Sequence, residues 1–427
     1  MIETAAIIST GTEIVQGLYA DTNARHLAGR LNKLGLRVAA IIACPDDPTE
    51  LEAALRHAAS RASLVVMTGG LGPTEDDINR DVCASVFRVE LRRDERAVEL
   101  MRGHFRARGL TMRPSNERQA LVPRGAIVLQ NMRGTAPGFF LPSPAERGAP
   151  EDAAPQCALL ALPGPPAEMT AMFEESALPL LRARIKGRVF ARTRTIHTFG
   201  RPESELNDLV REIFTHDPRV TLTILAKSHG VDFLVTARAE ETAAADALIA
   251  RCEAMIVERA GSGCVCGADS ETMQSAVARL LIAHRLTVSA AESCTGGLVA
   301  KMLTDTPGSS AYLKESYVVY SNEAKMRILG VKAATLESFG AVSEQTVREM
   351  AQGLLALSGA DYAIAVTGIA GPDGGTPQKP AGLTYLALAS PGRTQVLERR
   401  FPGDRELNRF HAALTALDML RKTISGG

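Results

Sequence analysis

The chain has 427 residues, which is too long for a single hydrophobic core and predicts two or three domains. Its 48 basic and 48 acidic residues balance, so no net field would draw it onto nucleic acid or a membrane surface. The seven cysteines are scattered, and no apolar run approaches the roughly 20 residues that cross a bilayer. We therefore expect a cytoplasmic protein with reduced thiols and no membrane partner.

The first 70 residues alternate between patterns typical of strands and of helices. Short apolar runs predict strands at 5–9, 36–43 and 64–67, and apolar residues spaced by three and four predict helices at 23–34 and from Thr49 onward. This alternation predicts an α/β fold with a doubly wound sheet of parallel strands covered by helices. Ligands of such sheets bind beyond the carboxyl ends of the strands.

The third of these strands runs into a glycine-rich segment, TGGLGPTEDD, at residues 68–77. Its glycines would let the backbone approach a ligand closely, and Asp76 and Asp77 supply hard oxygen ligands that suit Mg²⁺ beside phosphates. The residues expected to contact the substrate here are Gly69, Gly70, Gly72 and Thr74. The same segment also fits a glycine turn followed by an acidic helix start, which the helix dipole favours.

Residues 182–263 have the pattern of a small α+β module: a strand, a helix, two strands that break at His229 and Gly230, and a final helix. The module shows neither a clear GxxG clamp nor aromatic residues interleaved with basic ones, so we expect no binding to nucleic acid. We favour a linker or dimerisation module. Its histidines, His197, His216 and His229, are scattered in the sequence and do not suggest a metal site.

The segment AAESCTGG at residues 290–297 joins an apolar strand to a helix through a small polar corner. The first N–H groups of a helix have no intrahelical partner, so they offer an anion cradle to a residue placed before them. Ser293 stands there and is a candidate nucleophile. A serine at a helix start is also a common N-cap, and that alternative stays open on this segment alone.

Two more strands end in polar residues further along the chain. The segment YVVYSNEAKM at 317–326 carries Tyr320 and Lys325 near its strand end, and AIAVTGIAGPDGG at 363–375 carries Thr367 at its strand tip. Together with Ser293, these strand ends offer serine, lysine, tyrosine and threonine side chains and no histidine.

Five C-terminal motifs in order, ESCTGG, YSNEAK, GAVS, VTGIAGPDGG and KPAG, resemble the C-terminal domain of the competence-damage-inducible protein A family over residues 271–420. That domain is similar to nicotinamide mononucleotide deamidase. The motifs TGGLGPTEDD, RPSNERQA, GTAPG and LPGPPAEM resemble the N-terminal domain of the same family over residues 1–179. That domain is similar to the molybdopterin-binding MoaB and MogA fold and is associated with hydrolysis of the pyrophosphate in ADP-ribose.

The middle module resembles the KH-type module of this family, so the resemblance implies domains at residues 1–181, 182–263 and 264–427, the last an α/β deamidase domain. The sequence departs from the family pattern at two places. Asn79 stands where a threonine more often follows the paired aspartates, and PSPAERGAPEDAAPQ at 142–156 looks like an insertion. The insertion is rich in Pro, Ala, Gly and Glu, which predicts a mobile surface loop.

The resemblance implies an amidohydrolase that converts nicotinamide mononucleotide to nicotinic acid mononucleotide and ammonia. Cleaving a carboxamide needs a nucleophile, a base and donors for the oxyanion. We assign Ser293 as the nucleophile and neutral Lys325 as its base, with Tyr320 relaying the proton and Thr367 supporting the pair. Desolvation and a cationic pyridinium substrate would both lower the pKa of the lysine.

Backbone amides near Cys294 and Gly296 would hold the oxyanion. Cys294 is the rival nucleophile, but no histidine lies in these motifs to activate a thiol. The remaining residues expected to contact the substrate are Thr295, Gly296, Gly297, Gly368 and Arg405, with Arg405 and Arg409 four apart on the last helix.

The amidase step should need no metal, and Mg²⁺ is expected only at the N-terminal site, where the pyrophosphate of ADP-ribose would be cleaved. The partners that we expect are small nucleotide substrates and a second copy of the chain in a homodimer. The alternative is a non-enzymatic nucleotide-binding regulator or scaffold linked to competence or DNA damage.

Overall fold

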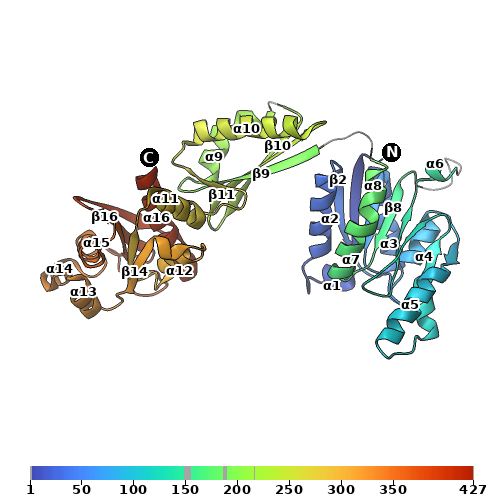
Figure 1. Ribbon diagram of the computed structural model, residues 1–427, viewed down its shortest axis with the longest axis horizontal. Coiled ribbons are helices and arrows are strands. Elements are labelled where there is room, and N and C mark those ends of the chain that lie inside the picture. The colour runs from blue at the N-terminus through green and yellow to red at the C-terminus, as the bar shows by residue number, and fades with distance from the viewer. Residues whose placement is uncertain (1, 149–154, 186–189, 216, 427) are drawn as a thin grey trace. The chain divides into compact units, whose positions relative to one another are not determined.

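The computed structural model describes residues 2–148, 155–185, 190–215 and 217–426 of the chain. The chain divides into two compact units, one formed by Met1–Arg192 with Arg238–Asp246 and the other by Thr193–Ala237 with Ala247–Gly427. Most of the middle module therefore belongs to the same compact unit as the C-terminal domain. The elements of each unit are labelled in Figure 1.

The N-terminal domain contains eight strands within the described residues: β1 (Thr4–Thr10), β2 (Arg37–Cys44), β3 (Leu64–Thr68), β4 (Leu91–Arg93), β5 (Leu121–Pro123), β6 (Ile127–Leu129), β7 (Gly138–Leu141) and β8 (Ala158–Leu162). Its α-helices are α1 (Thr12–Val15), α2 (Thr22–Lys33), α3 (Pro48–Arg61), α4 (Asn79–Val86), α5 (Glu95–Ala107), α6 (Pro144–Arg147), α7 (Pro166–Met172) and α8 (Leu178–Arg182). A 3-10 helix covers Pro114–Ala120, and a π-helical turn covers Phe173–Ala177.

The main sheet of this domain has the order β2-β1-β3-β8-β7-β6. The pairs from β2 to β8 are parallel, as the alternating pattern predicted, but β7 pairs antiparallel with β8 and with β6. This antiparallel edge lies beyond the first 70 residues, from which the parallel strands were predicted. The edge is antiparallel because the short segment between β6 and β7 has no room for the crossover helix that parallel strands require.

Helices cover both faces of this sheet, and neighbouring residues of β1 point into opposite cores. Ile8 packs in a core with α3 and α4, whereas Ile7 packs in a second core with α2, α7 and α8. Both side chains are fully buried. Since successive strand residues face opposite sides of a sheet, this arrangement confirms the doubly wound α/β fold.

The insertion at residues 142–156 is only partly described by the structure. Its first part forms α6, where Ser143 caps the helix and Gly148 ends it in the left-handed conformation. The side chain of Arg184 donates to Glu146 over 2.8 Å. The predicted mobile loop is therefore wrong for this part, because the segment has its own cap and stop signals. Residues 149–154 lie outside the described residues.

The middle module contains β9 (Phe190–Thr198), α9 (Glu203–Val210), β10 (Val220–Lys227), β11 (Gly230–Ala239), α10 (Thr242–Ala260) and β12 (Val265–Ala268). A short 3-10 helix follows α9 at Arg211–Thr215. The four strands form one sheet in the order β10-β11-β9-β12. Because β12 pairs with β9, it belongs to the middle sheet although it follows the domain boundary predicted at residue 264.

The C-terminal domain contains α11 (Met273–His284), β13 (Val288–Glu292), α12 (Leu298–Thr304), β14 (Leu313–Val318), α13 (Asn322–Leu329), α14 (Ala333–Phe339), α15 (Glu344–Ser358), β15 (Tyr362–Gly368), β16 (Leu383–Ser390), β17 (Arg393–Arg400) and α16 (Arg405–Ser425). A short 3-10 turn lies at Ser309–Ala311. The sheet order is β14-β13-β15-β16-β17, with β13 parallel to both neighbours and the last two pairs antiparallel.

This second sheet is also covered on both faces. Ala290 of β13 packs in a core with α11, α12 and α16, and the next residue, Ala291, packs in a core with α13, α14 and α15. The carboxyl ends of the parallel strands β14, β13 and β15 consequently meet at one edge of the sheet. Lys325, Ser293 and Thr367 follow or end these strands, so the fold brings the three predicted strand ends together.

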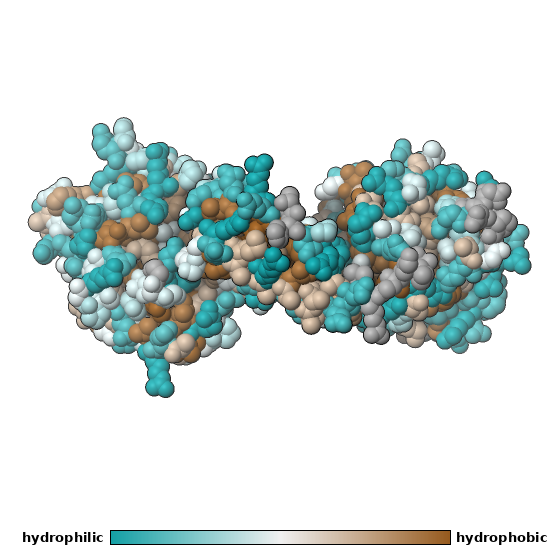
Figure 2. Space-filling model, turned by 90° about the horizontal axis from the view of Figure 1, so that it is seen from above, coloured by the Kyte–Doolittle hydropathy of each residue, from teal (hydrophilic) through white to brown (hydrophobic). Residues whose placement is uncertain are grey.

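Hydrophilic residues cover much of the visible face of both units, and hydrophobic residues form smaller patches between them (Figure 2). Among the helices of the described residues, none combines the length and the apolar character that crossing a bilayer requires.

Candidate active site

Ser293 is the first residue after β13, and it is held from the neighbouring strand. Its backbone N–H donates to the carbonyl of Val366 in β15 over 3.0 Å. The side chain is buried to 9% exposure, so a nucleophile here would be shielded from bulk water. Gly296 and Gly297 then turn the chain into α12 with φ of +59° and +95°, a region that residues with a Cβ disfavour.

Lys325 lies in the first turn of α13 and is almost completely buried, at 1% exposure. The helix begins at Asn322 because the hydroxyl of Ser321 accepts the backbone N–H of Ala324 over 3.1 Å. The Lys325 ammonium nitrogen is 3.2 Å from Ser293 Oγ, 2.9 Å from the Val319 carbonyl and 3.0 Å from the Tyr320 carbonyl. The structure thus joins the two residues expected to be nucleophile and base.

Burial lowers the pKa of Lys325 below its ordinary value, and the charge of Glu323 and that of any thiolate at Cys294 oppose this effect. A neutral lysine amine has two N–H bonds and one lone pair. The two backbone carbonyls, which can only accept, take both N–H bonds, so the lone pair is left to face Ser293 Oγ. In that state Lys325 can accept the serine proton.

Cys294, the rival nucleophile, is buried in the core between the sheet and α16. Burial raises the pKa of its thiol to about 11, although the backbone N–H groups of Cys294 and Thr295 lower it slightly. A thiol with a raised pKa carries little thiolate at neutral pH and is a poor nucleophile. The environment therefore favours Ser293.

Glu292 organises the loop after β13, and the sequence reasoning missed it. The side chain is fully buried, and it accepts backbone N–H groups from Gly297, Val299 and Ala300 over 2.9 to 3.0 Å. A carboxylate at a helix N-terminus satisfies N–H groups that lack intrahelical partners. A glutamate at a strand end just before a glycine-led helix is the sequence signal that could have found it.

Most residues of this loop that were predicted to bind the substrate form hydrogen bonds within the protein. Gly296 donates its N–H to the Ser293 carbonyl over 3.2 Å, and Gly297 donates to Glu292, so neither amide is available to an oxyanion. The predicted oxyanion role of the Gly296 amide is therefore corrected. The amides of Cys294 and Thr295 have no oxygen acceptor among the described residues, and the buried Thr295 hydroxyl also lacks a partner.

Two arginines of α16 hold the loops around the site. Arg409 donates to the carbonyls of Cys294 over 3.1 Å and Thr295 over 2.8 Å, which fixes the loop that carries Ser293. Arg405 is more exposed and donates to the Gly371 carbonyl over 2.9 Å. Arg405 therefore lies at the rim of the loops, and its contact with substrate stays a prediction.

The two supporting residues lie differently from each other. The side chain of Tyr320 is 63% exposed, and among the described residues no hydrogen bond joins its phenol to Ser293 or Lys325. Its backbone carbonyl, not its hydroxyl, contacts the lysine, so the geometry does not favour the predicted proton relay. Thr367 is buried at the end of β15 and donates to the Ala341 carbonyl over 2.9 Å, which ties a second loop to the site.

Gly368 follows Thr367 at the tip of β15. A Cβ there would approach the Thr384 hydroxyl to 2.7 Å, so the close packing of β15 and β16 requires glycine. In the structure its role is therefore steric, and a contact to substrate stays a prediction.

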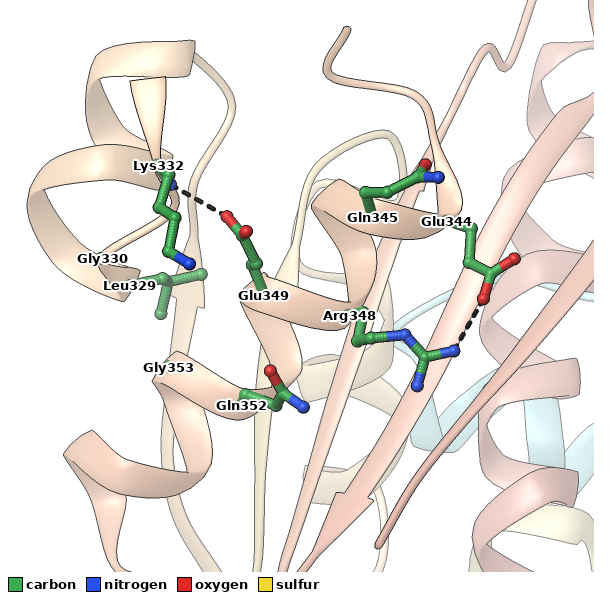
Figure 3. Close-up of a pocket in the computed structure, with 9 residues that line it drawn as sticks. All are labelled: Leu329, Gly330, Lys332, Glu344, Gln345, Arg348, Glu349, Gln352 and Gly353. Atoms are coloured by element: carbon green, nitrogen blue, oxygen red, sulfur yellow. Dashed lines mark hydrogen bonds and ion pairs between the residues drawn. The ribbon is translucent and has the colours of Figure 1, made fainter. Parts of the chain in front are cut away.

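A polar cleft elsewhere in this domain is not the predicted site. It has a volume of about 490 Å³ and lies between α15 and the end of α13, as Figure 3 shows. Three of its charged side chains already have partners: Glu349 accepts the Lys332 backbone N–H over 2.9 Å, and Arg348 pairs with Glu344 over 2.6 Å. None of the predicted catalytic residues lines it.

The glycine loop after β3 is the second predicted site. Gly69 and Gly70 have φ of +100° and +57°, and a Cβ on Gly70 would collide with the carboxamide of Asn79. Asn79 is fully buried and donates to Thr10 Oγ1 over 3.0 Å and to the Gly69 carbonyl over 2.8 Å. The residue that departs from the family pattern thus braces the loop.

The two aspartates of this loop have different surroundings. Asp77 accepts the N–H groups of Gly72 and Thr74 over 2.7 and 2.8 Å, and the Thr74 hydroxyl also donates to it. Asp76 is exposed. A carboxylate oxygen has more than one lone pair, so Asp77 can still bind a cation while it holds the loop.

Arg80 of α4 is a further residue that the sequence reasoning missed. It is 1% exposed, donates to the Gly72 carbonyl over 3.1 Å, and leaves one terminal nitrogen buried without a partner. Burial lowers its pKa to about 10, partly opposed by the charge of Asp77. A buried guanidinium with an unsatisfied donor is costly, and an anionic ligand would relieve that cost. The arginine three residues after Asp77 was the available signal.

The histidines of the middle module also differ from the expectation. His197 and His229 both contact one buried carboxylate, that of Asp232, at 2.6 and 2.9 Å. The interpretation of these histidines as scattered is therefore wrong for these two, because β9 and β11 are neighbours in the sheet. His216 lies outside the described residues.

Three domain models match the chain. They are a probable molybdopterin binding domain at residues 6–183, a damage-inducible protein CinA KH domain at 193–264 and a CinA C-terminal domain at 270–424. The fold and these matches define a three-domain α/β protein, with a MoaB/MogA-like N-terminal domain, a KH-like middle domain and a CinA C-terminal domain.

Full-length relatives support this class. A putative competence-damage inducible protein of Symbiobacterium thermophilum is 43% identical, covering 99% of each chain. A CinA-like protein of Gloeobacter violaceus is 40% identical, covering 99% of this chain and 97% of that one. The chain belongs to the CinA family of competence-damage inducible proteins. A crystal structure of competence/damage inducible protein CihA from Agrobacterium tumefaciens is 44% identical over 36% of this chain and 95% of its own, with a TM-score of 0.35.

Proposed function

We propose that the C-terminal domain hydrolyses the carboxamide of nicotinamide mononucleotide, giving nicotinic acid mononucleotide and ammonia. The observation that carries this proposal is the buried contact of 3.2 Å between Lys325 Nζ and Ser293 Oγ at the carboxyl edge of the sheet. A serine beside an unprotonated amine is an activated nucleophile, and acyl transfer is the chemistry that such a pair performs. Membership of the CinA family by itself supports only the assignment to competence-damage inducible proteins, and it does not specify this reaction.

The reaction proceeds in two balanced steps. Lys325 takes the proton of Ser293 while Oγ attacks the amide carbon, and the lysine then delivers that proton to the departing nitrogen, which leaves as ammonia. Water, activated by the same amine, hydrolyses the resulting ester and regenerates the serine. One water is consumed for each ammonia released, and no metal is required at this site.

The oxyanion of each tetrahedral intermediate needs donors that are not already used. The N–H groups of Cys294 and Thr295 come nearest to this condition, because no oxygen of the described residues accepts them and the Cys294 sulfur beside them is only a weak acceptor. They follow the nucleophile directly, as oxyanion donors often do. Arg405, at the rim of the site, is proposed to contact the substrate. The cationic pyridinium of the substrate would lower the pKa of Lys325 further, since a nearby positive charge disfavours the protonated amine.

The test is a product assay on the full chain with nicotinamide mononucleotide. We expect nicotinic acid mononucleotide and ammonia in equal amounts, at the same rate with EDTA as without it. Ammonia release that EDTA abolishes and a divalent ion restores contradicts the metal-free mechanism. If neither product forms while the nucleotide still binds, the chain is a nucleotide-binding regulator or scaffold linked to competence or DNA damage.

The N-terminal loop is proposed to cleave the pyrophosphate of ADP-ribose. The supporting observations are the positive-φ glycines and the unsatisfied buried guanidinium of Arg80, which suit a phosphate group. Asp76 and Asp77 would hold Mg²⁺, which neutralises phosphate charge when bound. Incubation with ADP-ribose, with and without Mg²⁺, should give AMP and ribose phosphate only when the ion is present. We also propose that the protein is cytoplasmic and forms a homodimer. Sedimentation of the purified chain would test the homodimer.

A further inference from the structure

The sheet of the middle module brings two imidazoles and a carboxylate to one point. His197 Nδ1 and His229 Nε2 lie 2.6 and 2.9 Å from the same atom, Asp232 Oδ1. One ligand atom from each residue lies within 4.8 Å of the others, and no other group of this kind occurs among the described residues. The two rings stand nearly edge to face, at an interplanar angle of 77°, and each directs a nitrogen to Asp232.

The backbone around this cluster is fixed. His197 lies in β9 and Asp232 in the adjacent β11, and the hydroxyl of Thr198 donates to the Val231 carbonyl over 2.7 Å. Gly230, with φ of +136°, packs so closely on the Thr198 carbonyl that a Cβ would collide with it. This glycine lets the turn place His229 over the sheet, and the cluster does not depend on flexible side chains alone.

A second hydrogen bond determines which atom His197 offers. Its Nε2 lies 2.9 Å from the backbone carbonyl of Asp269, and because a carbonyl only accepts, Nε2 carries the proton. In a neutral imidazole the lone pair is then on Nδ1, which faces Asp232 and His229. Histidines that bind metals are usually oriented in this way, by a carbonyl or carboxylate on the other nitrogen.

We propose that His197, His229 and Asp232 bind one divalent transition-metal ion of the zinc class. Two neutral imidazoles and one carboxylate are a donor set that Zn²⁺ and Co²⁺ accept in proteins, with a further position left for water or a ligand. Side-chain exposures of 14% for His197, 8% for Asp232 and 39% for His229 leave one side of the centre open.

The open side faces a small cavity that the middle module shares with the C-terminal domain within one compact unit. The cavity has a volume of about 200 Å³ and is lined by both histidines, Cys266, Gln274, Phe410 and Leu414, among others. His411 of α16 contacts the Ser228 carbonyl over 2.8 Å, so the turn that carries His229 is also fastened to that helix. An ion at the cluster would therefore brace the contact between the module and α16.

The same contacts would also form without a metal if the histidines were protonated and paired with Asp232 as a hydrogen-bonded triad. The two states differ in one measurable property. Protonated imidazoles have no free lone pair, so a charged triad would take up little Co²⁺ at neutral pH, whereas the proposed site would bind it.

The experiment uses the full chain, stripped of metal with a chelator, kept reduced, and held in excess Mg²⁺ so that oxygen-rich sites are filled. Co²⁺ is titrated while visible absorption is recorded, and Zn²⁺ is then added. We expect one Co²⁺ per chain with d–d bands, displaced by Zn²⁺, and a melting temperature raised by Zn²⁺.

His229→Ala, a half-exposed position, and Asp232→Asn should each weaken Co²⁺ binding by more than about tenfold, since even the loss of an outer partner has effects of that size. His284→Ala is the matched control, because His284 is exposed on α11, and it should bind as the unaltered chain does. If the unaltered chain takes up no Co²⁺, or if His229→Ala and Asp232→Asn bind it as tightly as His284→Ala, the cluster is a hydrogen-bonded triad and the proposal is wrong.

Discussion

The loops after β3 and β13 each follow a central strand of a sheet that helices cover on both faces, and each contains glycines at positive φ. In both loops one carboxylate accepts hydrogen bonds from several backbone N–H groups. Asp77 accepts N–H groups from Gly72 and Thr74, and Glu292 accepts them from the start of α12. What differs is the side chain that the neighbouring structure supplies. At the second loop a buried lysine meets a serine, and at the first a buried arginine faces the loop.

This difference decides the chemistry that each loop can support. A lysine with a lowered pKa can be neutral and move a proton, whereas an arginine stays charged and can only bind. At the second loop the proposed nucleophile, Ser293, is therefore in contact with its proposed base, Lys325 of α13, before any ligand arrives. At the first loop a buried terminal nitrogen of Arg80 has no partner, and a phosphate could accept its hydrogen bond. Two loops of similar backbone are thus proposed to serve proton transfer in one domain and anion binding in the other.

The largest expected effect comes from removing the nucleophile. Ser293→Ala should lower the rate of ammonia release by about 10³-fold or more, because the covalent step has no alternative route of similar barrier. Cys294→Ala should keep the rate within about tenfold, since burial holds that thiol in its protonated form. Steady-state rates of the two variants decide the matter, and the reverse ranking would identify a cysteine amidase.

The independence of the two loops is tested by Asp76→Ala combined with Asp77→Ala. This variant should lose Mg²⁺-dependent hydrolysis of ADP-ribose, because no carboxylates remain to hold the cation against a pyrophosphate. Deamidation should change by less than the roughly 5- to 150-fold typical of coupled sites. Glu75→Ala, in the same exposed stretch, is the control. Loss of both activities in a variant that circular dichroism shows to be folded contradicts two separate sites.

The protonation state of Lys325 should appear in the pH profile of the amidase. Below the lowered pKa of the lysine the base is protonated, so kcat/KM should rise about tenfold per pH unit and level off at a pH below 10.5, the ordinary value. Lys325→Arg cannot lose its proton and should show low activity with no such rise. A flat profile in the unaltered chain would exclude Lys325 as the base.

The same lysine affects stability with a definite sign. Between its lowered pKa and 10.5 the unfolded chain binds more protons than the folded one, so the contribution of Lys325 to the free energy of unfolding increases with pH across that window. This contribution is present in full above 10.5 and is lost as the pH falls through the lowered pKa.

The smallest expected effect concerns Glu292. Glu292→Gln keeps the size of the side chain but replaces a charged acceptor of three amides, and it should lower the free energy of unfolding by about 1–3 kcal/mol. Glu337→Gln, exposed on α14, should leave stability nearly unchanged. Urea unfolding of both variants measures the difference. Equal midpoints for the two would show that the carboxylate does not hold the loop.

Local pattern predicted much of the fold. The strands β1, β2 and β3 were expected to within two residues of their observed bounds, as were α2 and the start of α3. Alternation between strand and helix patterns also indicated the doubly wound sheet. The antiparallel edge at β7 was missed because it depends on the length of a loop, and the short helix α6 was missed because it depends on a single cap. The periodicity of apolar residues reports neither.

The candidate sites, too, were predicted only in part. Ser293 and Lys325 were predicted as partners from polar residues at strand ends and from the family resemblance. Their side chains do meet, because the carboxyl ends of the parallel strands lie at one edge of the sheet. The roles of Glu292, Arg80 and Arg409 were not predicted. Each acts by reaching backbone groups of a loop, and the sequence does not state which loop folds back within reach. Tyr320 was assigned a role for its hydroxyl, and the structure uses its carbonyl.

The sequence by itself determined the elements, the order of the three domains and the strand ends that carry polar residues, since these depend on periodicity and motifs within short stretches of chain. Only the tertiary structure decided which side chains pair across the chain. The contacts between Arg409 and the Cys294 carbonyl, 115 residues apart, and between His197 and Asp232, 35 apart, both depend on this. Strand order and helix packing set those distances, and burial then sets the pKa values on which the chemistry depends.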